Sequence, residues 1–149
     1  MGNFEITDNF YLDGKPFQII SGAIHYFRIV PEYWQDRLEK LVNMGCNTVE
    51  TYIPWNFHEP NRGQFIWEGM RDICRFIETA QELGLYIIIR PSPYICSEWE
   101  FGGLPAWLLR DRNMRLRCSY EPYLNAVKNY YSAVSYTHLR AHETRGNLV

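Results

Sequence analysis

A cluster of acidic and aromatic side chains follows a short apolar run near residue 90. The run, residues 85–89, reads Leu-Tyr-Ile-Ile-Ile after Gly84, and it predicts a strand buried on both faces. Pro91 and Pro93 have no amide hydrogen for a sheet ladder, so the strand should end at about Arg90. The loop that follows carries Tyr94, Glu98, Trp99, Glu100 and Phe101.

Carboxylates beside flat aromatic rings suit a carbohydrate ligand. A carboxylate accepts hydrogen bonds from sugar hydroxyls, and an aromatic face covers the apolar C–H surface of a sugar ring. Loops that follow buried parallel strands are also where α/β proteins commonly place their ligand sites. The alternative is a structural loop whose aromatic side chains only close the end of a barrel. The sequence favours the sugar site.

Residues 4–20 predict a short β-hairpin at the start of the chain. Asp13-Gly14 is a strong turn signal between the extended segments 10–12 and 17–20. The second arm is expected to continue as far as His25.

Strand and helix patterns alternate along the rest of the chain. Residues 47–53 predict a strand that ends at Pro54, and helices are expected from Pro31 to Gly45, up to Gly84, and from about Pro122. The expected apolar stripes of the three helices are Trp34, Leu38, Leu41 and Val42; Met70, Ile73, Phe76, Ile77 and Ala80; and Tyr123, Val127, Tyr130 and Val134.

Three successive strand-then-helix units predict a parallel sheet. A doubly wound dinucleotide fold would need a Gly-x-Gly-x-x-Gly turn after its first strand, whereas residues 25–28 are His-Tyr-Phe-Arg, and Gly102-Gly103 lacks the spacing. A (β/α)8 TIM barrel makes no such demand. Because such a barrel needs roughly 250 residues, the 149 residues of this chain predict one truncated after about three β/α units.

Composition excludes several classes of function. A net charge of −2 gives no support to a nucleic-acid partner, and no apolar run is long enough to span a membrane. No secretory signal is visible, so we expect a cytoplasmic protein. The four cysteines, Cys46, Cys74, Cys96 and Cys118, form no Cys-x-x-Cys pair, which argues against zinc and thioredoxin-type sites.

Several long motifs of the chain resemble glycoside hydrolase family 35, the β-galactosidase family. The similarity runs from about residue 9 to residue 134 and is closest from Arg90 to Leu108. The matching stretches are Leu-Asp-Gly-Lys-Pro-Phe at 12–17, Ser-Gly-Ala-Ile-His-Tyr-Phe-Arg at 21–28, Glu-Thr-Tyr-Ile-Pro-Trp-Asn at 50–56, and His-Glu-Pro at 58–60. The resemblance implies a barrel that cleaves terminal β-galactosyl residues with retention, without a cofactor.

The resemblance carries substrate-binding roles onto four residues. Tyr52 is similar to the family tyrosine that binds galactose at the end of the second strand, and Glu98 to the glutamate that bonds galactose hydroxyls. Cys96 and Ser97 lie in the same galactose-contacting turn, and many relatives have Ala at the position of Ser97. The alternatives are that Tyr52 fills the barrel interior and that Glu98 pairs with an arginine, Arg90 or Arg110.

Two further expectations concern the neighbours of these residues. Strand alternation places Glu50 and Tyr52 on one face, plausibly facing inward. Arg90 ends the next strand, and we expect it to steady a carboxylate across the barrel.

The chain is expected to contain no catalytic residue. Retaining glycosidases use two carboxyl groups about 5–5.5 Å apart. In family 35 the acid/base glutamate follows an asparagine after the fourth strand, and no Asn-Glu pair occurs in this sequence. Glu98 and Glu100 lie too close together on one loop to flank a glycosidic bond from opposite sides.

Residues 135–149 depart from the family pattern and are expected to be a tail foreign to it, after a barrel segment over residues 1–134. His138 and His142 have the spacing of two metal ligands on a helix, but two ligands in a terminal segment predict no metal site.

The sequence therefore predicts a fragment of a retaining exo-β-galactosidase that is inactive by itself and whose partner is a β-galactoside. One alternative is another exo-β-glycosidase on the same barrel, such as a β-glucosaminidase. The other is a non-catalytic sugar-binding relative.

Overall fold

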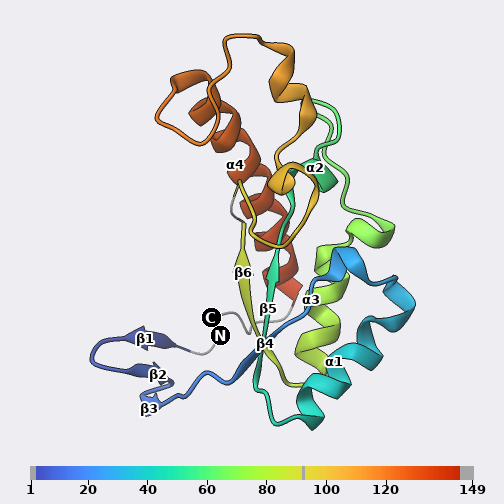
Figure 1. The fold of residues 1–149 in the computed structure, drawn as a ribbon. Coiled ribbons are helices and arrows are strands. Elements are labelled where there is room, and N and C mark those ends of the chain that lie inside the picture. The colour runs from blue at the N-terminus through green and yellow to red at the C-terminus, as the bar shows by residue number, and fades with distance from the viewer. Residues whose placement is uncertain (1–2, 92, 145–149) are drawn as a thin grey trace.

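A three-stranded parallel sheet forms the centre of the molecule. The computed structural model describes residues 3–91 and 93–144, with side chains as far as Tyr136. The sheet contains β4 (Ser21–Ala23), β5 (Thr48–Tyr52) and β6 (Tyr86–Arg90), hydrogen-bonded in that order and all parallel. The predicted parallel sheet is confirmed, and the described part of the chain forms an open segment rather than a closed barrel (Figure 1).

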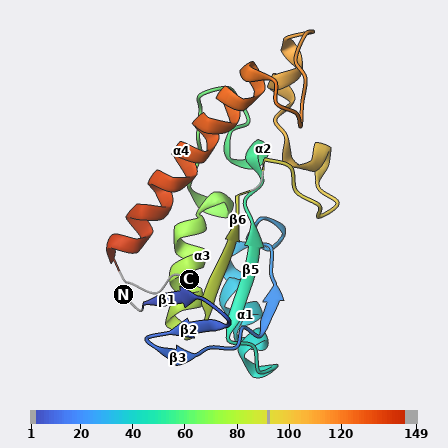
Figure 2. The same ribbon diagram turned by 90° about the vertical axis from the view of Figure 1, so that its left-hand side faces the viewer.

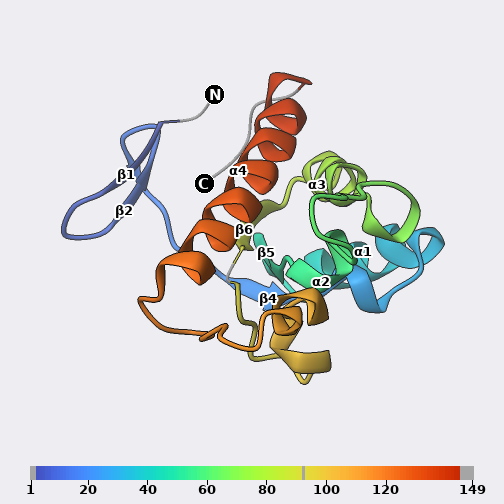
Figure 3. The same cartoon turned by 90° about the horizontal axis from the view of Figure 1, so that it is seen from above.

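Helices connect and cover these strands, as Figure 3 shows for α1 and α3, which lie together on one side of the sheet. Helix α3 packs against α1, α4 and β6. The α-helices are α1 (Trp34–Asn43), α2 (Trp55–His58), α3 (Ile73–Glu82) and α4 (Glu121–Thr144). The 3-10 helices are η1 (Tyr26–Arg28), η2 (Pro31–Tyr33), η3 (Gly69–Arg71), η4 (Glu100–Gly103) and η5 (Ala106–Arg110).

The predicted helices are confirmed, with two corrections to their apolar stripes. Asp72 caps α3 by accepting a hydrogen bond from the backbone N–H of Arg75 at 2.9 Å, so Met70 falls in η3, outside α3, and is exposed. Val42 is also 37% exposed, because the buried stripe of α1 consists of Trp34, Leu38 and Leu41.

The N-terminal region forms three short strands instead of the predicted two-armed hairpin. β1 (Phe4–Ile6), β2 (Phe10–Leu12) and β3 (Lys15–Pro16) make an antiparallel sheet. The turn at residues 13–14 is confirmed, with both residues at positive φ. The second arm is shorter than predicted. The backbone N–H of Phe17 still donates to the carbonyl of Phe10 at 2.8 Å, but residues 21–23 pair with β5 in the parallel sheet.

The small sheet lies toward the end of the molecule where the parallel strands begin (Figure 2). The ring of Phe17 contacts that of Tyr86 at the start of β6, with the centroids 4.9 Å apart. The loops over residues 93–120 lie at the opposite end, toward which β5 and β6 point (Figure 1). One end of the molecule therefore holds the small antiparallel sheet, and the other holds the candidate ligand-binding loops beyond the carboxyl ends of the parallel strands.

Large aromatic side chains fill the core between the sheet and the helices. Trp55 of α2 stacks on Tyr130 of α4 with centroids 5.0 Å apart, and both are fully buried. The Tyr130 hydroxyl donates to the carbonyl oxygen of Ile53 at 2.7 Å, which satisfies two polar groups that burial would otherwise leave unpaired. This bond fixes α4 against the end of β5.

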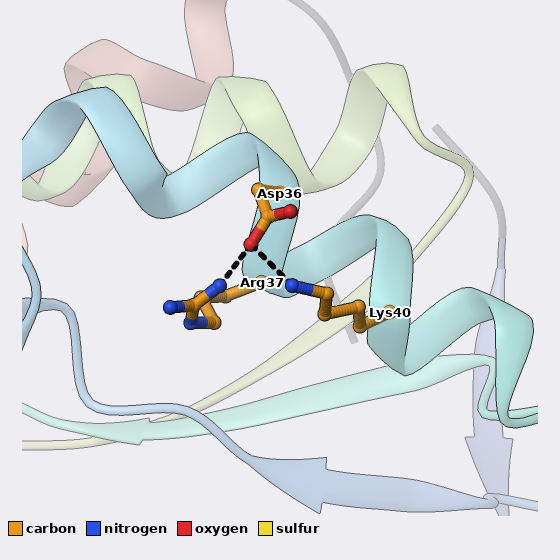
Figure 4. A network of polar contacts seen from close by, with 3 residues as sticks. All are labelled: Asp36, Arg37 and Lys40. Atoms are coloured by element: carbon orange, nitrogen blue, oxygen red, sulfur yellow. Dashed lines mark hydrogen bonds and ion pairs between the residues drawn. The ribbon is translucent and has the colours of Figure 1, made fainter.

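The exposed side of α1 carries a small ion-pair network (Figure 4). The carboxylate of Asp36 accepts from Lys40, one turn further along, at 2.8 Å and also from Arg37. These contacts lower the pKa of Asp36, with the Lys40 hydrogen bond as the largest cause. Because all three side chains are solvated, such pairs contribute little to stability.

Helix α4 continues past residue 134 as far as Thr144, so the backbone shows no break where we placed the foreign tail. The side chains of His138 and His142 lie outside the described part of the chain. Within that part, no helix combines the length and the apolar character needed to cross a membrane.

Candidate sugar-binding site

Tyr52 and Arg90 lie side by side at the ends of β5 and β6. They are direct partners in the parallel register, and the guanidinium carbon of Arg90 lies 4.3 Å from the centre of the Tyr52 ring. Arg90 also donates to the carboxylate of Glu50 at 2.8 Å, a hydrogen bond that raises the pKa of Arg90. Arg90 therefore steadies a carboxylate as expected, but this carboxylate is on the neighbouring strand instead of across the barrel.

His25 extends this group on the side of β4. Its ring lies 5.4 Å from that of Tyr52 and stacks on Phe27 at 5.3 Å. Partial burial, followed by the positive charge of Arg28, lowers the pKa of His25, so the imidazole is neutral at pH 7. His25 was not predicted to belong to the site. Its position immediately after a strand end was the available clue.

The turn at residues 96–98 presents three different environments. Cys96 is exposed and Glu98 is exposed, whereas Ser97 is 5% exposed and its Oγ has no hydrogen-bond partner among the described residues. Glu98 has a φ of +48°, in the left-handed region that non-glycine residues rarely adopt. The turn thus directs the Glu98 side chain to the surface while the Ser97 hydroxyl is buried.

The carboxylate of Glu98 makes no ion pair within the described residues. Arg90, one of the two arginines considered as its partner, binds Glu50 instead, and Arg110 makes no ion pair in the same part of the chain. The alternative that Glu98 forms an ion pair with one of these two arginines therefore has no support in the described part of the chain. The four-residue assignment to galactose stays a prediction, since the structure contains no sugar.

Aromatic and amide side chains hold the next part of the loop. Trp99 packs edge-on against Phe27 at 4.7 Å and Phe57 at 6.0 Å, and its indole N–H donates to Asn56 Oδ1 at 2.9 Å. The amide nitrogen of Asn56 donates to the carbonyl of Glu100 at 3.3 Å. Trp99 was expected among the sugar-facing aromatics, but both its ring and its N–H make contacts within the protein.

The first two residues of the His-Glu-Pro motif at residues 58–60 are buried, whereas Pro60 is exposed. His58 Nδ1 lies 3.0 Å from the carbonyl oxygen of Ile66, so Nδ1 must carry the proton, and Nε2 accepts from the hydroxyl of Tyr26. Burial lowers the pKa of His58 to about 4. A histidine held neutral between one acceptor and one donor has a structural role.

Glu59 also fixes the structure from a buried position. Its carboxylate accepts from the indole of Trp55 at 2.5 Å and from the backbone N–H of Gly63 at 2.6 Å, while its carbonyl accepts from Trp107 at 3.0 Å. These bonds join α2, its following loop and η5.

A pocket of about 470 Å³ lies beside η5 and the start of α4. The guanidinium of Arg62 stands 5.7 Å from the Trp107 ring, and both residues line the pocket. None of the four predicted galactose-binding residues lines it. Among the described residues, no group of three His, Cys, Asp or Glu side chains is placed to bind a metal ion.

Solved structures of sugar-processing proteins share this arrangement of strands and helices. The chain superposes on GH5_18 from Streptomyces cattleya in complex with GlcNAc with a TM-score of 0.67 and 16% identity, covering 87% of this chain and 32% of that one. For the exo-beta-1,4-mannosidase Op5Man5 from Opitutaceae bacterium strain TAV5 the TM-score is 0.61 at 17% identity, over 82% and 22% of the two chains. At these identities the likeness defines the class of fold alone, an α/β segment of the kind that these proteins contain.

The sequence comparison is more specific. The model of glycosyl hydrolases family 35 matches residues 9–147, and the chain belongs to this family. It is 53% identical over 127 residues to a Mus musculus beta-galactosidase, and 52% identical over 123 residues to the Homo sapiens beta-galactosidase-1-like protein 2. These matches cover 85% and 83% of this chain and only 20% and 19% of the relatives, so the chain spans about a fifth of their length. The family match also extends into residues 135–147, which we had set apart as a tail.

Proposed function

We propose that this chain is the N-terminal, substrate-binding part of a retaining exo-β-galactosidase that hydrolyses terminal non-reducing β-D-galactosyl residues. The observation that carries the proposal is the identity of about 52% to beta-galactosidases over the segment that holds Tyr52 and residues 96–98. Tyr52 is the last residue of β5 and residues 96–98 follow the neighbouring parallel strand β6, and barrel enzymes bind their substrates at these carboxyl ends.

The two side chains would recognise galactose in different ways. The exposed carboxylate of Glu98 can accept two hydroxyl hydrogen bonds, and a sugar lacking one of those hydroxyls would leave an acceptor unpaired. Tyr52 combines a ring face with a phenolic hydroxyl, and the Arg90 guanidinium against its ring restricts its orientation.

The catalytic carboxylates would come from a longer polypeptide that completes the eight-stranded barrel, called the complete enzyme below. Family 35 places them after later strands, and this sequence contains no Asn-Glu pair. The 149-residue chain alone should therefore hydrolyse no galactoside. Its open parallel sheet also leaves β4 and β6 without outer neighbours in the described part of the chain.

The test compares substrates and variants in the complete enzyme. We expect hydrolysis of an aryl β-galactoside, little hydrolysis of the matching β-glucosaminide, and release of the β-anomer of galactose as followed by NMR. Glu98→Gln should raise KM about tenfold or more, because one hydroxyl acceptor becomes a donor. Arg37→Ala on α1 is the matched surface control.

Three results would contradict the proposal in different ways. Preference for the glucosaminide would indicate a different exo-β-glycosidase. Galactose binding without any turnover would indicate a non-catalytic relative. Full activity of a variant carrying both Glu98→Gln and Tyr52→Phe would show that the galactose site lies elsewhere.

A further inference from the structure

Arg28 makes the only described side-chain contacts to the backbone of the Glu98 turn. Its Nη2 donates to the carbonyl oxygen of Ser97 and, at 3.2 Å, to that of Glu98. Arg28 ends η1, directly after β4, and is 70 residues away from Glu98 in the sequence. The contact therefore ties the loop of the third strand to the end of the first.

The guanidinium of Arg28 is itself held in place by aromatic rings. Its central carbon lies 5.8 Å from the centre of the Phe27 ring and 5.9 Å from that of Trp99. Trp99 is fixed in turn through Asn56. A planar guanidinium can lie against rings and present several N–H groups in a fixed fork, whereas a lysine ammonium cannot do both.

The backbone of Glu98 needs such support. A glutamate at a φ of +48° is strained, and strained residues persist only where their surroundings determine the conformation. Arg28 binds the carbonyls of the two peptide units that flank the Cα of Glu98, so it restrains the backbone on both sides of the carbon from which the Glu98 side chain projects. The carboxylate of Glu98 makes no contact of its own within the described residues that could replace this restraint.

We infer that Arg28 is a positioning residue for Glu98, acting through the backbone of the turn and making no contact with the sugar. The inference rests on the proposed function and deepens it. In this role, Arg28 determines how accurately the Glu98 carboxylate is placed for the galactose hydroxyls that it binds.

The test measures kcat and KM of the complete enzyme for a galactoside and for the matching monodeoxygalactosides. A deoxy substrate that lacks a hydroxyl bound by Glu98 should lose one Glu98 hydrogen bond, and Glu98→Gln identifies each such substrate because the variant raises its KM by a smaller factor than that of the galactoside. We expect Arg28→Ala and Arg28→Lys to raise KM for the galactoside about tenfold, with a smaller change in kcat. On the identified deoxy substrates, the two Arg28 variants should also raise KM by a smaller factor than on the galactoside, because one of the hydrogen bonds that they weaken is already absent. Arg37→Ala, which removes a solvated arginine from α1, should leave all values unchanged.

The possible results distinguish a failure of the Arg28 inference from a failure of the proposed galactosidase function. An unaltered enzyme that cleaves no galactoside refutes the proposed function. An active enzyme that is sensitive to Glu98→Gln but insensitive to both Arg28 variants refutes the inference alone. Equal losses on every deoxy substrate would also refute it, because they would show a general structural role. Full activity of Arg28→Lys would show that the guanidinium fork is not required.

Discussion

Gly102 closes the loop that contains the Glu98 turn, and its replacement by alanine offers a demanding test of the site's geometry. The backbone N–H of Ile95 donates to the Gly102 carbonyl at 2.8 Å, so the two ends of the turn are joined there. Gly102 has a φ of +59°, and a Cβ atom added to it would lie 2.1 Å from Cε2 of Tyr94. Alanine would therefore meet both backbone strain and a steric overlap.

The size of the effect follows from these two terms. A left-handed φ costs an L-residue about 1–2 kcal/mol. Separating the methyl group from the Tyr94 ring requires a shift of more than 1 Å, since carbon atoms in contact lie about 3.5–4.0 Å apart. Overpacking of this kind adds about 1–3 kcal/mol. The total expected loss of stability is about 2–5 kcal/mol, and the shift also moves the peptide segment that positions Glu98.

A second glycine separates the cost of backbone strain from the cost of steric overlap. Gly84 lies just before β6 and has a φ of +79°, but a Cβ added to it would meet nothing within 4 Å. Gly84→Ala should therefore lose only the backbone term and keep full activity. Gly102→Ala should in addition lower kcat/KM for a galactoside about 10- to 100-fold in the complete enzyme, since misplacements near 1 Å can cost that much. Equal thermal stability and equal kcat/KM of the two alanine variants would show that contact with Tyr94 does not control the geometry of the turn.

Three further predictions apply to the complete enzyme. Arg90→Lys should lower kcat/KM about tenfold by losing the planar contacts of Arg90 to Tyr52 and Glu50, and unimpaired kinetics would disprove this positioning role. Ser97→Ala should keep KM within about twofold and raise the unfolding free energy by up to about 1 kcal/mol, because the buried hydroxyl has no described partner; a large KM increase in the kinetic assay would place that hydroxyl on the sugar. The pKa of His58, about 4 in the folded state, lies below its usual 6.5, so the unfolded state binds more protons between these values; stability should fall by about 2 kcal/mol from pH 7 to pH 5. In urea unfolding, His58→Gln should reduce this pH dependence by that amount, and an unchanged slope would contradict the assignment.

Local sequence was sufficient to predict the main strands and helices. The apolar run before Pro91 predicts β6, and the helical spacing of apolar residues around Phe76 predicts α3, because each pattern lies within one short segment of the sequence. The errors arose where distant pairing decides the structure. Residues 17–20 have strand character, but after the hydrogen bond from Phe17 to Phe10 they lead from one sheet to the other, because Ser21 pairs with Thr48 of β5.

In the candidate site, too, the features set by local sequence were predicted and those set by distant contacts were not. Strand alternation correctly placed Glu50 and Tyr52 together, because period two is a local property. The partners of Arg90 and Arg28 depended on strand register and on loop conformation, and no spacing within the sequence encodes either. A contact between residues 28 and 97 can be read only from the folded chain.

The loop of β6 is fastened by groups from outside it, Arg28 after β4 and Asn56 in α2. This has a practical consequence for exchanging specificity among family members. Residues 91–107 do not form a module that can be transplanted alone, because a graft would arrive without the two side chains that shape it. A chimaera that also carries residues 25–28 and 55–57 from the same donor would bring those side chains with it.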